Sequence, residues 1–93
     1  MIRSFRDKRT EAIFGREAIR GFPNDVSRQA RVKLNILNAA EQIDDLRVPP
    51  GNRLEKLSGN RAGQHSIRIN DQWRVCFRWH DDNAFEVEVT DYH

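Results

Sequence analysis

The sequence predicts an α+β fold in which two N-terminal helices pack on a small antiparallel β-sheet. Three observations predict it: apolar residues recur at helical spacing in the first half of the chain, they alternate with polar residues in the second half, and Pro49-Pro50-Gly51-Asn52 marks a turn between the halves. Helices that precede a run of strands, instead of alternating with them, favour this layout over a parallel sheet. The 93 residues fit one domain over residues 1–93, without an internal repeat or a linker.

The first helix is predicted from Asp7 to about Ile19, where apolar residues keep helical spacing. Ile2–Phe5 precede it and alternate weakly, which fits either a short edge strand or an extended lead-in. Gly21-Phe22-Pro23 should end the helix, because a proline disfavours helical geometry at the residue before it.

A second helix is predicted to follow at once, with Asn24 or Asp25 as its N-terminal cap. Its apolar residues recur on one face, as expected of a helix that buries that face against a sheet. These residues are Val26, Ala30, Leu34, Leu37 and Ala40, with Ile36 and Ile43 beside them.

Four strands are predicted after the central turn, connected as an antiparallel meander. Short segments rich in Gly, Asn and Asp separate them, as is typical of loops and turns. The strands are Arg53–Leu57, Gln64–Ile69, Trp73–Trp79 and Phe85–Thr90, joined by a loop at 58–63, a tight turn at 70–72 and a longer turn at 80–84.

The registers of the last two hairpins follow from the requirement that apolar side chains share one face. A three-residue turn sets Ile67 opposite Val75, whereas a two-residue turn would pair Ile69 with Arg74. The same requirement predicts a core face that the helices cover. On that face His65 is expected opposite Phe77, Trp79 opposite Phe85, Phe77 opposite Val87 and Val75 opposite Val89.

The other face of the predicted sheet is polar and carries Arg68 directly opposite Arg74, where like charges oppose folding. A phosphate held between the two guanidinium groups would relieve this repulsion, because arginine matches the geometry of phosphate oxygens. The alternative is that both side chains extend into water. Arg78 lies opposite Glu86, which predicts an ordinary cross-strand ion pair.

The formal net charge of +2 is unevenly distributed along the chain. Residues 1–40 hold nine Lys/Arg against four Asp/Glu, whereas residues 81–93 hold five Asp/Glu and no Lys/Arg. A basic surface of this kind either attracts polyanions such as nucleic acid or is simply solvated. The residues to which both readings apply are Arg16, Arg20, Arg28, Arg31 and Lys33.

Cys76 is the single cysteine, so an internal disulfide is excluded, which suits a reducing compartment. The first ten residues lack the apolar segment of a signal peptide, and no apolar run is long enough to span a membrane. We therefore expect a cytoplasmic protein without membrane contact.

The stretch RLEKLSGNRAGQHSIRINDQWRVCFRW, residues 53–79, and the final Asp91-Tyr92-His93 resemble the HigB branch of the RelE-type toxins, in particular its GraT-like members. The opening MIRSF and the PPGNRL stretch at 49–54 fit as well, so the resemblance covers essentially the whole chain. The two motifs in this order and spacing are specific. The resemblance implies a RelE-like fold in which a small antiparallel sheet carries the catalytic face.

The resemblance also implies an mRNA endonuclease, an interferase, that depends on the ribosome, cuts mRNA in the A site and uses neither a metal nor another cofactor. It implies three partners: the ribosome with its mRNA, a helix-turn-helix antitoxin of the HigA type that holds the toxin inactive, and operator DNA contacted indirectly through that antitoxin. Two rival functions stay open, a basic module that binds RNA or DNA without cutting and a regulatory subunit that acts through its antitoxin complex.

Among the site residues that the resemblance implies, Asp91, Tyr92 and His93 match the active-site tripeptide of HigB-like toxins, and Arg74 matches a phosphate-contacting arginine. Some relatives carry a histidine where this chain has Glu55, so the identity of the base stays open. Their loop often reads Leu-Lys-Gly-Asp, whereas residues 57–60 here read Leu-Ser-Gly-Asn, which predicts a weaker grip on RNA.

Cutting RNA without a metal requires deprotonation of a 2′-hydroxyl, stabilisation of charge on the phosphorane and protonation of the leaving 5′-oxygen. Histidine, with an ordinary pKa of about 6.5, can perform either proton transfer, and arginine stabilises the phosphorane. We therefore expect His93 to be the general acid or base, with Asp91 orienting it and Tyr92 in proton transfer or positioning. The expected RNA-binding residues are Arg68, Glu55, which is also the reserve base, Lys56 and Arg61.

Several of these residue types also have plainer explanations. A histidine at a chain end is often frayed, and Trp73, Phe77 and Trp79 alternate as core residues do, although aromatic rings can also stack on bases. Cys76 fits a structural thiol better than a nucleophile. The three histidines lack the spacing of metal ligands, so no metal site is expected.

Overall fold

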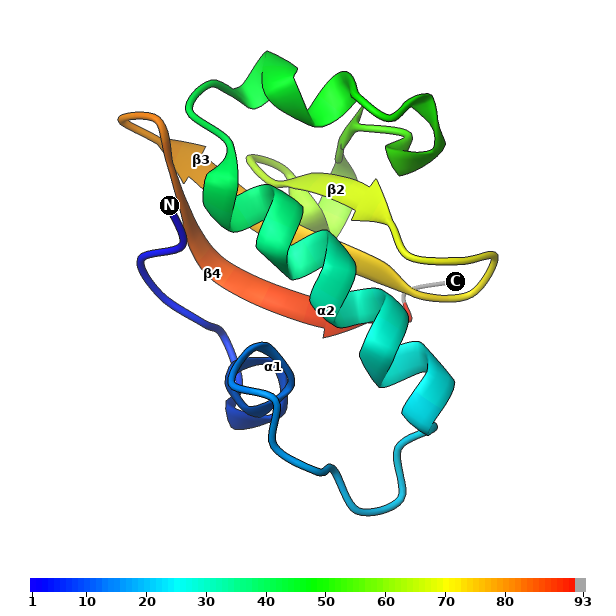
Figure 1. Cartoon of the computed structure of the whole chain (residues 1–93). Helices are drawn as coiled ribbons and strands as arrows, with labels where there is room; N and C mark the ends of the chain where they lie inside the picture. The colour runs from blue at the N-terminus through cyan, green and yellow to red at the C-terminus, as the bar shows by residue number, and fades with distance from the viewer. Residues whose placement is uncertain (92–93) are drawn as a thin grey trace.

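The computed structural model describes residues 1–91 and has two helices packed with one four-stranded antiparallel sheet of order β1-β2-β3-β4 (Figure 1). The long helix α2 crosses one face of the sheet, and α1 lies beside β4. The predicted α+β class is therefore confirmed. The elements are α1 (Lys8–Phe14), α2 (Asn24–Ala39), β1 (Glu55–Lys56), β2 (His65–Arg68), β3 (Arg74–His80) and β4 (Asn83–Thr90), with short 3₁₀ helices η1 (Ile43–Arg47), η2 (Pro50–Asn52) and η3 (Gly59–Arg61).

Helix α1 begins as predicted but ends earlier than predicted. The Asp7 carboxylate caps it by accepting a hydrogen bond from the Thr10 amide at 2.7 Å. The helix stops at Phe14 instead of Ile19, because Arg16 adopts a left-handed φ of 64° and the amides that follow Gly15 bond back to the last helical turn. This is a Schellman ending, in which the left-handed position is usually glycine.

Helix α2 lacks the predicted side-chain cap. Its N-cap is Pro23, and Asn24 and Asp25 are the first helical residues, so the prediction that one of them caps the helix is wrong. The Asp25 carboxylate instead lies in the first turn, where negative charge offsets the helix dipole. The buried face agrees with the predicted one; its apolar members within the helix are Val26, Ala30, Leu34 and Leu37.

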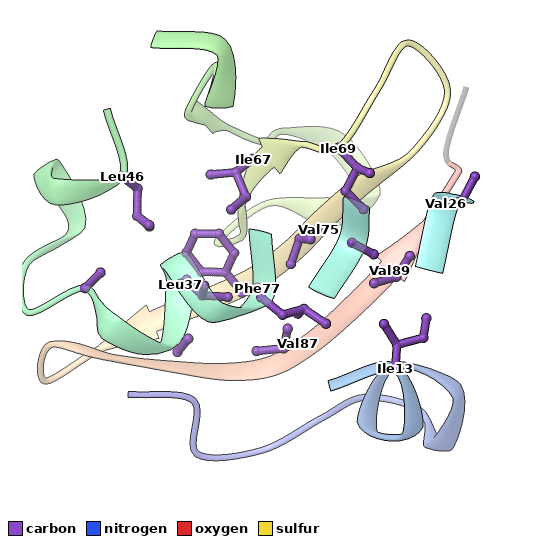
Figure 2. Packing of buried hydrophobic residues seen from close by; sticks show 14 of the residues in the cluster. Ile13, Val26, Leu37, Leu46, Ile67, Ile69, Val75, Phe77, Val87 and Val89 are labelled. Carbon is purple, nitrogen blue, oxygen red and sulfur yellow. The ribbon is translucent and has the colours of Figure 1, made fainter. Parts of the chain in front are cut away.

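The core lies between α2 and one face of the sheet (Figure 2). Phe77 and Val75 from β3 and Ile67 from β2 are fully buried there, and Leu37 faces them from α2. Ile13 closes the same cluster from α1. Each large apolar side chain buried in this way stabilises the fold by about 1.5–3 kcal/mol, so this layer is the main source of stability.

The predicted register of the β2–β3 hairpin is confirmed, including the pairs Ile67–Val75 and Arg68–Arg74. The turn keeps its three residues because the Asn70 side chain closes it, accepting hydrogen bonds from the Gln72 amide at 2.8 Å and the Trp73 amide at 2.7 Å. An asparagine side chain that bonds the backbone two residues ahead is typical of such turns.

The predicted register of the β3–β4 hairpin is right at Val75–Val89 and wrong nearer the turn. A β-bulge lies between the pairs Cys76–Glu88 and Arg78–Phe85, and Glu86 within it has a φ of 51°. The bulge interrupts the predicted Phe77–Val87 pair, although both side chains stay buried, and it sets Ala84 instead of Phe85 opposite Trp79.

The predicted five-residue turn at 80–84 is also wrong, because β3 and β4 extend to His80 and Asn83. Only Asp81 and Asp82 remain in the turn, with φ values of 50° and 59°. Two successive residues with positive φ are characteristic of a type I′ hairpin turn, and Asp tolerates this geometry better than most residues.

The other predicted strand ends differ mainly at the first strand. β1 spans two residues instead of five, because Arg53 adopts a left-handed φ of 46° and Leu57 lies beyond the ladder pairs. Ile2–Phe5 are an extended lead-in that touches the outer edge of β4 through single parallel bridges at Ala84 and Val87. Residues 1–91 contain no helix with the length and apolar content that crossing a membrane requires.

Candidate active site

On the polar face of the sheet, carboxylates of the same chain neutralise the two arginines whose like charges were expected to oppose folding. Arg68 and Arg74 are paired across β2 and β3, as predicted. Arg68 forms an ion pair with Asp71, and Arg74 Nη1 lies 3.6 Å from Glu55 Oε1. Neither of the predicted resolutions, an external phosphate or two side chains extended into water, is therefore needed to explain the fold.

Arg74 is the most enclosed of these arginines, with a side chain that is 18% exposed. Its Nη1 is buried and lacks a hydrogen-bond partner within the described chain, since the Glu55 contact is too long for one. A buried guanidinium donor is usually satisfied, so an unpaired one needs an explanation. A ligand oxygen at this position would satisfy it.

A hollow of about 440 Å³ lies between β1 and the η3 loop. Three sequence-predicted RNA-binding residues, Glu55, Lys56 and Arg61, line it together with Leu57, Ser58 and Asn60. Glu55 connects the hollow to Arg74 through the ion pair. The structure therefore gathers Glu55, Arg61 and Arg74 on the polar face of the sheet, whereas Lys56 pairs with His65 and lines the hollow from the edge strand.

Arg61 is fixed on the sheet face by Glu88, a residue that the sequence did not single out for the site. Arg61 Nη1 lies 3.2 Å from Glu88 Oε1 and donates to Gln64 Oε1 at 3.1 Å. Glu88 also lies 3.9 Å from Arg6 Nε, and its side chain is only 18% exposed. The predicted Val75–Val89 pair also sets Glu88 opposite Cys76, and this register was the sequence signal that Glu88 lies on the polar face.

Ser66 and Cys76 are paired across β2 and β3, and both are buried beneath the charged side chains of this face. Burial raises the pKa of the Cys76 thiol to about 11, and the nearby Arg61 guanidinium offsets part of that rise. A thiol with so high a pKa is a poor nucleophile, which favours the structural interpretation of Cys76.

The chain leaves the sheet beside Arg74, because Thr90 is its partner on β4. Asp91 follows, is exposed, and accepts a hydrogen bond at Oδ2 from Gln72 Nε2 at 3.0 Å. The predicted catalytic residues Tyr92 and His93 lie outside the described residues. The orienting role expected of Asp91 toward His93 therefore stays a prediction.

Lys33 of α2 is a further cation, and its charge is close enough to Arg68 to interact with it. The sequence analysis had left open whether this lysine binds nucleic acid or is solvated. Its Nζ donates to the buried Asn52 side chain. Burial and the neighbouring Arg68 guanidinium lower the pKa of Lys33. Its proximity to Arg68 adds positive charge near the start of β3.

The described histidines do not add to the site. His65 lies on the core face, where its ring stacks with Phe77 at a centroid distance of 6.1 Å, and burial, followed by the charge of Lys56, lowers its pKa. His80 pairs with Asp81 at the exposed hairpin tip. Within residues 1–91, no three His, Cys, Asp or Glu side chains gather closely enough to hold a metal ion.

A family model described as the RelE-like toxin of type II toxin-antitoxin system HigB matches residues 3–93. The chain belongs to the HigB-like toxin family. It is therefore a RelE-like toxin of a type II toxin-antitoxin system. The resemblance on which the sequence prediction rested is confirmed.

Two curated relatives support the HigB assignment over nearly the full length of the chain. Toxin HigB-1 of Vibrio cholerae serotype O1 is 43% identical over 88 residues, which are 94% of this chain and 93% of that protein. Endoribonuclease HigB of Proteus vulgaris is 28% identical over 93 residues, which are the whole of both chains.

Solved structures confirm the RelE-like fold of this HigB-like toxin. The YoeB-YefM complex from Staphylococcus aureus contains a chain that superposes with a TM-score of 0.60 at 18% identity, covering 100% of this chain and 98% of that one. A heterotetrameric YoeB-YefM toxin-antitoxin complex from the same organism gives a TM-score of 0.57 at 20% identity, with the same coverage. At such low identity the likeness is one of fold.

Proposed function

We propose that this HigB-like toxin is a ribosome-dependent endoribonuclease that cuts mRNA in the A site by acid–base catalysis without a metal or another cofactor. The observation that carries the proposal is Arg74, an enclosed guanidinium with an unsatisfied Nη1, on the strand beside which the chain leaves the sheet toward Tyr92 and His93. The relative from Proteus vulgaris, which carries the name endoribonuclease, supports the same activity.

In this mechanism Arg74 binds the scissile phosphate. A phosphate oxygen takes the place of the Glu55 carboxylate and accepts a hydrogen bond from Arg74 Nη1, while Arg68 leaves Asp71 to bind a second oxygen. Charge-assisted bonds from guanidinium to phosphate are strong, and they strengthen further as charge grows on the phosphorane. The sheet fixes the backbone of both arginines, so the rearrangement is confined to their side chains and the two carboxylates.

The proton transfers fall to the residues that flank this phosphate. A base takes the 2′-hydroxyl proton as the 2′-oxygen attacks phosphorus, and an acid protonates the leaving 5′-oxygen, giving a 2′,3′-cyclic phosphate and a 5′-hydroxyl. We assign His93 to one of these transfers, Tyr92 to proton transfer or positioning, and Asp91 to orienting His93. Glu55 is the alternative base, because its carboxylate lies beside the Arg74 guanidinium.

The hollow beside β1 extends the proposed RNA path. Lys56 and Arg61 line it and would contact the RNA backbone next to the scissile phosphate. Arg61 contributes this contact only in part, because Glu88 neutralises it. This internal pairing agrees with the weaker grip on RNA that the loop sequence predicts.

The proposed partners follow from the same family. We expect a cognate helix-turn-helix antitoxin of the HigA type, contact with operator DNA through that antitoxin, and action in the cytoplasm on translating ribosomes. The family description and the YoeB-YefM complexes among the structural neighbours support an antitoxin partner. Antitoxin binding can be measured separately from RNA cleavage, so the two expectations can be tested independently.

Arg74→Ala tests the proposed chemistry. We expect the variant to lose about 10²–10³-fold in the rate of mRNA cleavage, measured by toeprinting on ribosomes that carry a defined mRNA, because removal of one charge-stabilising donor typically costs that much. The matched control is Arg47→Ala, which removes an exposed arginine from η1 and should leave the rate unchanged. Circular dichroism would verify that both variants are folded.

Removing Tyr92 and His93 should abolish cleavage and growth inhibition while antitoxin binding is retained. The products of the full-length toxin should carry a 5′-hydroxyl. A polynucleotide kinase should therefore label them without prior dephosphorylation. Cleavage by the truncated toxin would refute the assignment of acid and base. A 5′-phosphate product would refute the mechanism, and folded wild-type toxin that binds ribosomes without any cleavage would favour a non-catalytic binding module.

A further inference from the structure

The outer edge of β4 is closed by the first ten residues of the chain, in two different ways. Along its first half the closure is made by backbone: the Arg3 amide donates to the Ala84 carbonyl at 2.8 Å, and the Arg6 amide donates to the Val87 carbonyl at 2.9 Å. At Val89 the backbone of the lead-in has already turned into α1. Two side chains of that helix take over the closure there.

Both polar backbone groups of Val89 are bound by consecutive residues of α1. The Val89 amide donates to Thr10 Oγ1 at 2.9 Å, and Arg9 Nη2 donates to the Val89 carbonyl at 2.8 Å. Thr10 is fully buried, and its own amide is bonded to the Asp7 cap. The end of β4 is therefore attached to the first turn of a capped helix.

Arg9 is in turn held by two aromatic rings. Its guanidinium carbon lies 4.9 Å from the centre of the Phe22 ring and 5.5 Å from that of Trp73, and the two rings meet edge to face at 5.0 Å. Cation–π contacts of this kind restrict a side chain that would otherwise be flexible. Arg9 thus joins Trp73, the residue before Arg74, to Val89, two residues before Asp91.

We propose that Arg9 and Thr10 are positioning residues, which set where the chain leaves the sheet at Thr90 and Asp91 relative to Arg74. The inference rests on the proposed function, because it gives this attachment a role in the proposed active site. Catalytic groups must be held within a fraction of an ångström, and a misplacement of about 1 Å can lower a rate roughly 100-fold. A free end of β4 would not hold Asp91 to that tolerance.

Thr10→Val and Arg9→Met test the proposal, since each removes a polar contact to Val89 and approximately keeps side-chain size. We expect each to lower the kcat of ribosome-dependent cleavage about tenfold, with KM and antitoxin affinity unchanged. Thr10→Ser retains the hydroxyl and should restore the rate. Backbone ¹⁵N relaxation should show faster motion of Thr90 and Asp91 in the Thr10→Val and Arg9→Met proteins.

Ser4→Ala is the matched control. The Ser4 hydroxyl accepts a hydrogen bond from the Glu86 amide at 2.8 Å, so this variant also removes a side-chain contact to the outer edge of β4, but at the bulge. We expect it to lower thermal stability about as much as Thr10→Val while leaving kcat and the relaxation of Thr90 and Asp91 at wild-type values.

The outcomes separate the two proposals. Wild-type toxin that does not cleave would refute the proposed function, and the relaxation experiment would still decide whether α1 restrains Thr90 and Asp91. If wild-type toxin cleaves but Thr10→Val and Arg9→Met cleave equally fast, or if Ser4→Ala slows cleavage as much as they do, the positioning role is refuted.

Discussion

The two faces of the sheet are buried by different kinds of interaction. On the core face, Ile67, Val75 and Phe77 are fully buried against α2 by apolar contact alone. On the opposite face, burial depends on charged pairs such as Arg61–Glu88 and Arg74–Glu55. Apolar side chains in a packed core offer no charge to a ligand. An arginine in an ion pair can exchange its carboxylate for another anion. The core face therefore stabilises the fold, whereas the proposed function requires the arginines of the charged face to exchange a carboxylate for a phosphate.

The largest expected difference between the faces is at Phe77. Phe77→Ala should lower the free energy of unfolding by about 3–5 kcal/mol, because it leaves a cavity in a fully packed layer. Urea denaturation followed by circular dichroism measures this loss. Phe77→Leu preserves more volume and provides a folded comparison if the alanine variant unfolds. A loss below about 1 kcal/mol for Phe77→Ala would contradict the role given to the core face.

A smaller effect is expected at Glu88 on the charged face. Glu88→Gln keeps the shape of the side chain but removes the carboxylate charge that faces Arg61 and Arg6, which should cost about 1–3 kcal/mol of stability. Glu86→Gln is the control on the same strand. Its ion pair with Arg78 is about half exposed on both sides, and such pairs contribute about 0–1 kcal/mol.

Urea denaturation of the two glutamine variants measures the difference directly. Equal stability of Glu88→Gln and wild type would show that the enclosed carboxylate does not hold Arg61 in place. The same variant should bind RNA more tightly, because it removes one negative charge beside Arg61. Filter binding of a short RNA at two salt concentrations would reveal this as a steeper dependence on salt.

The difference between the faces also explains which parts of the fold could be predicted from the sequence. The buried stripe of α2 and the pair Ile67–Val75 were predictable, because apolar side chains must share a face and a shift by one residue would expose them. The end of α1, the Asp81-Asp82 turn and the bulge were not. Each depends on a non-glycine residue with positive φ, among them Arg16 and Glu86, and residue type signals that geometry poorly.

The sequence predicted the arginines of the candidate site but not the carboxylates that pair with them. The opposition of Arg68 and Arg74 follows from strand register alone. The carboxylates that neutralise them come from β1 and from a turn, so Glu55 and Asp71 could be assigned only from their positions in space. The same holds for Lys33, whose bond to the Asn52 side chain joins α2 to η2.

The smallest expected effect is the pH dependence contributed by Cys76, the buried thiol of the charged face. Its pKa is about 11 in the folded toxin and 9.0 ordinarily, so the unfolded chain releases this proton first as the pH rises. Stability should therefore fall between pH 9 and pH 11, by roughly 1 kcal/mol at pH 10, and should be unaffected by this group below pH 9.

Cys76→Ala removes the titrating group. The stability difference between wild type and Cys76→Ala, measured by thermal denaturation from pH 8 to pH 10.5, should thus shift against wild type above pH 9. A constant difference over that range would mean that the thiol is not held protonated by burial, and that water reaches the layer beneath Arg61 and Glu88.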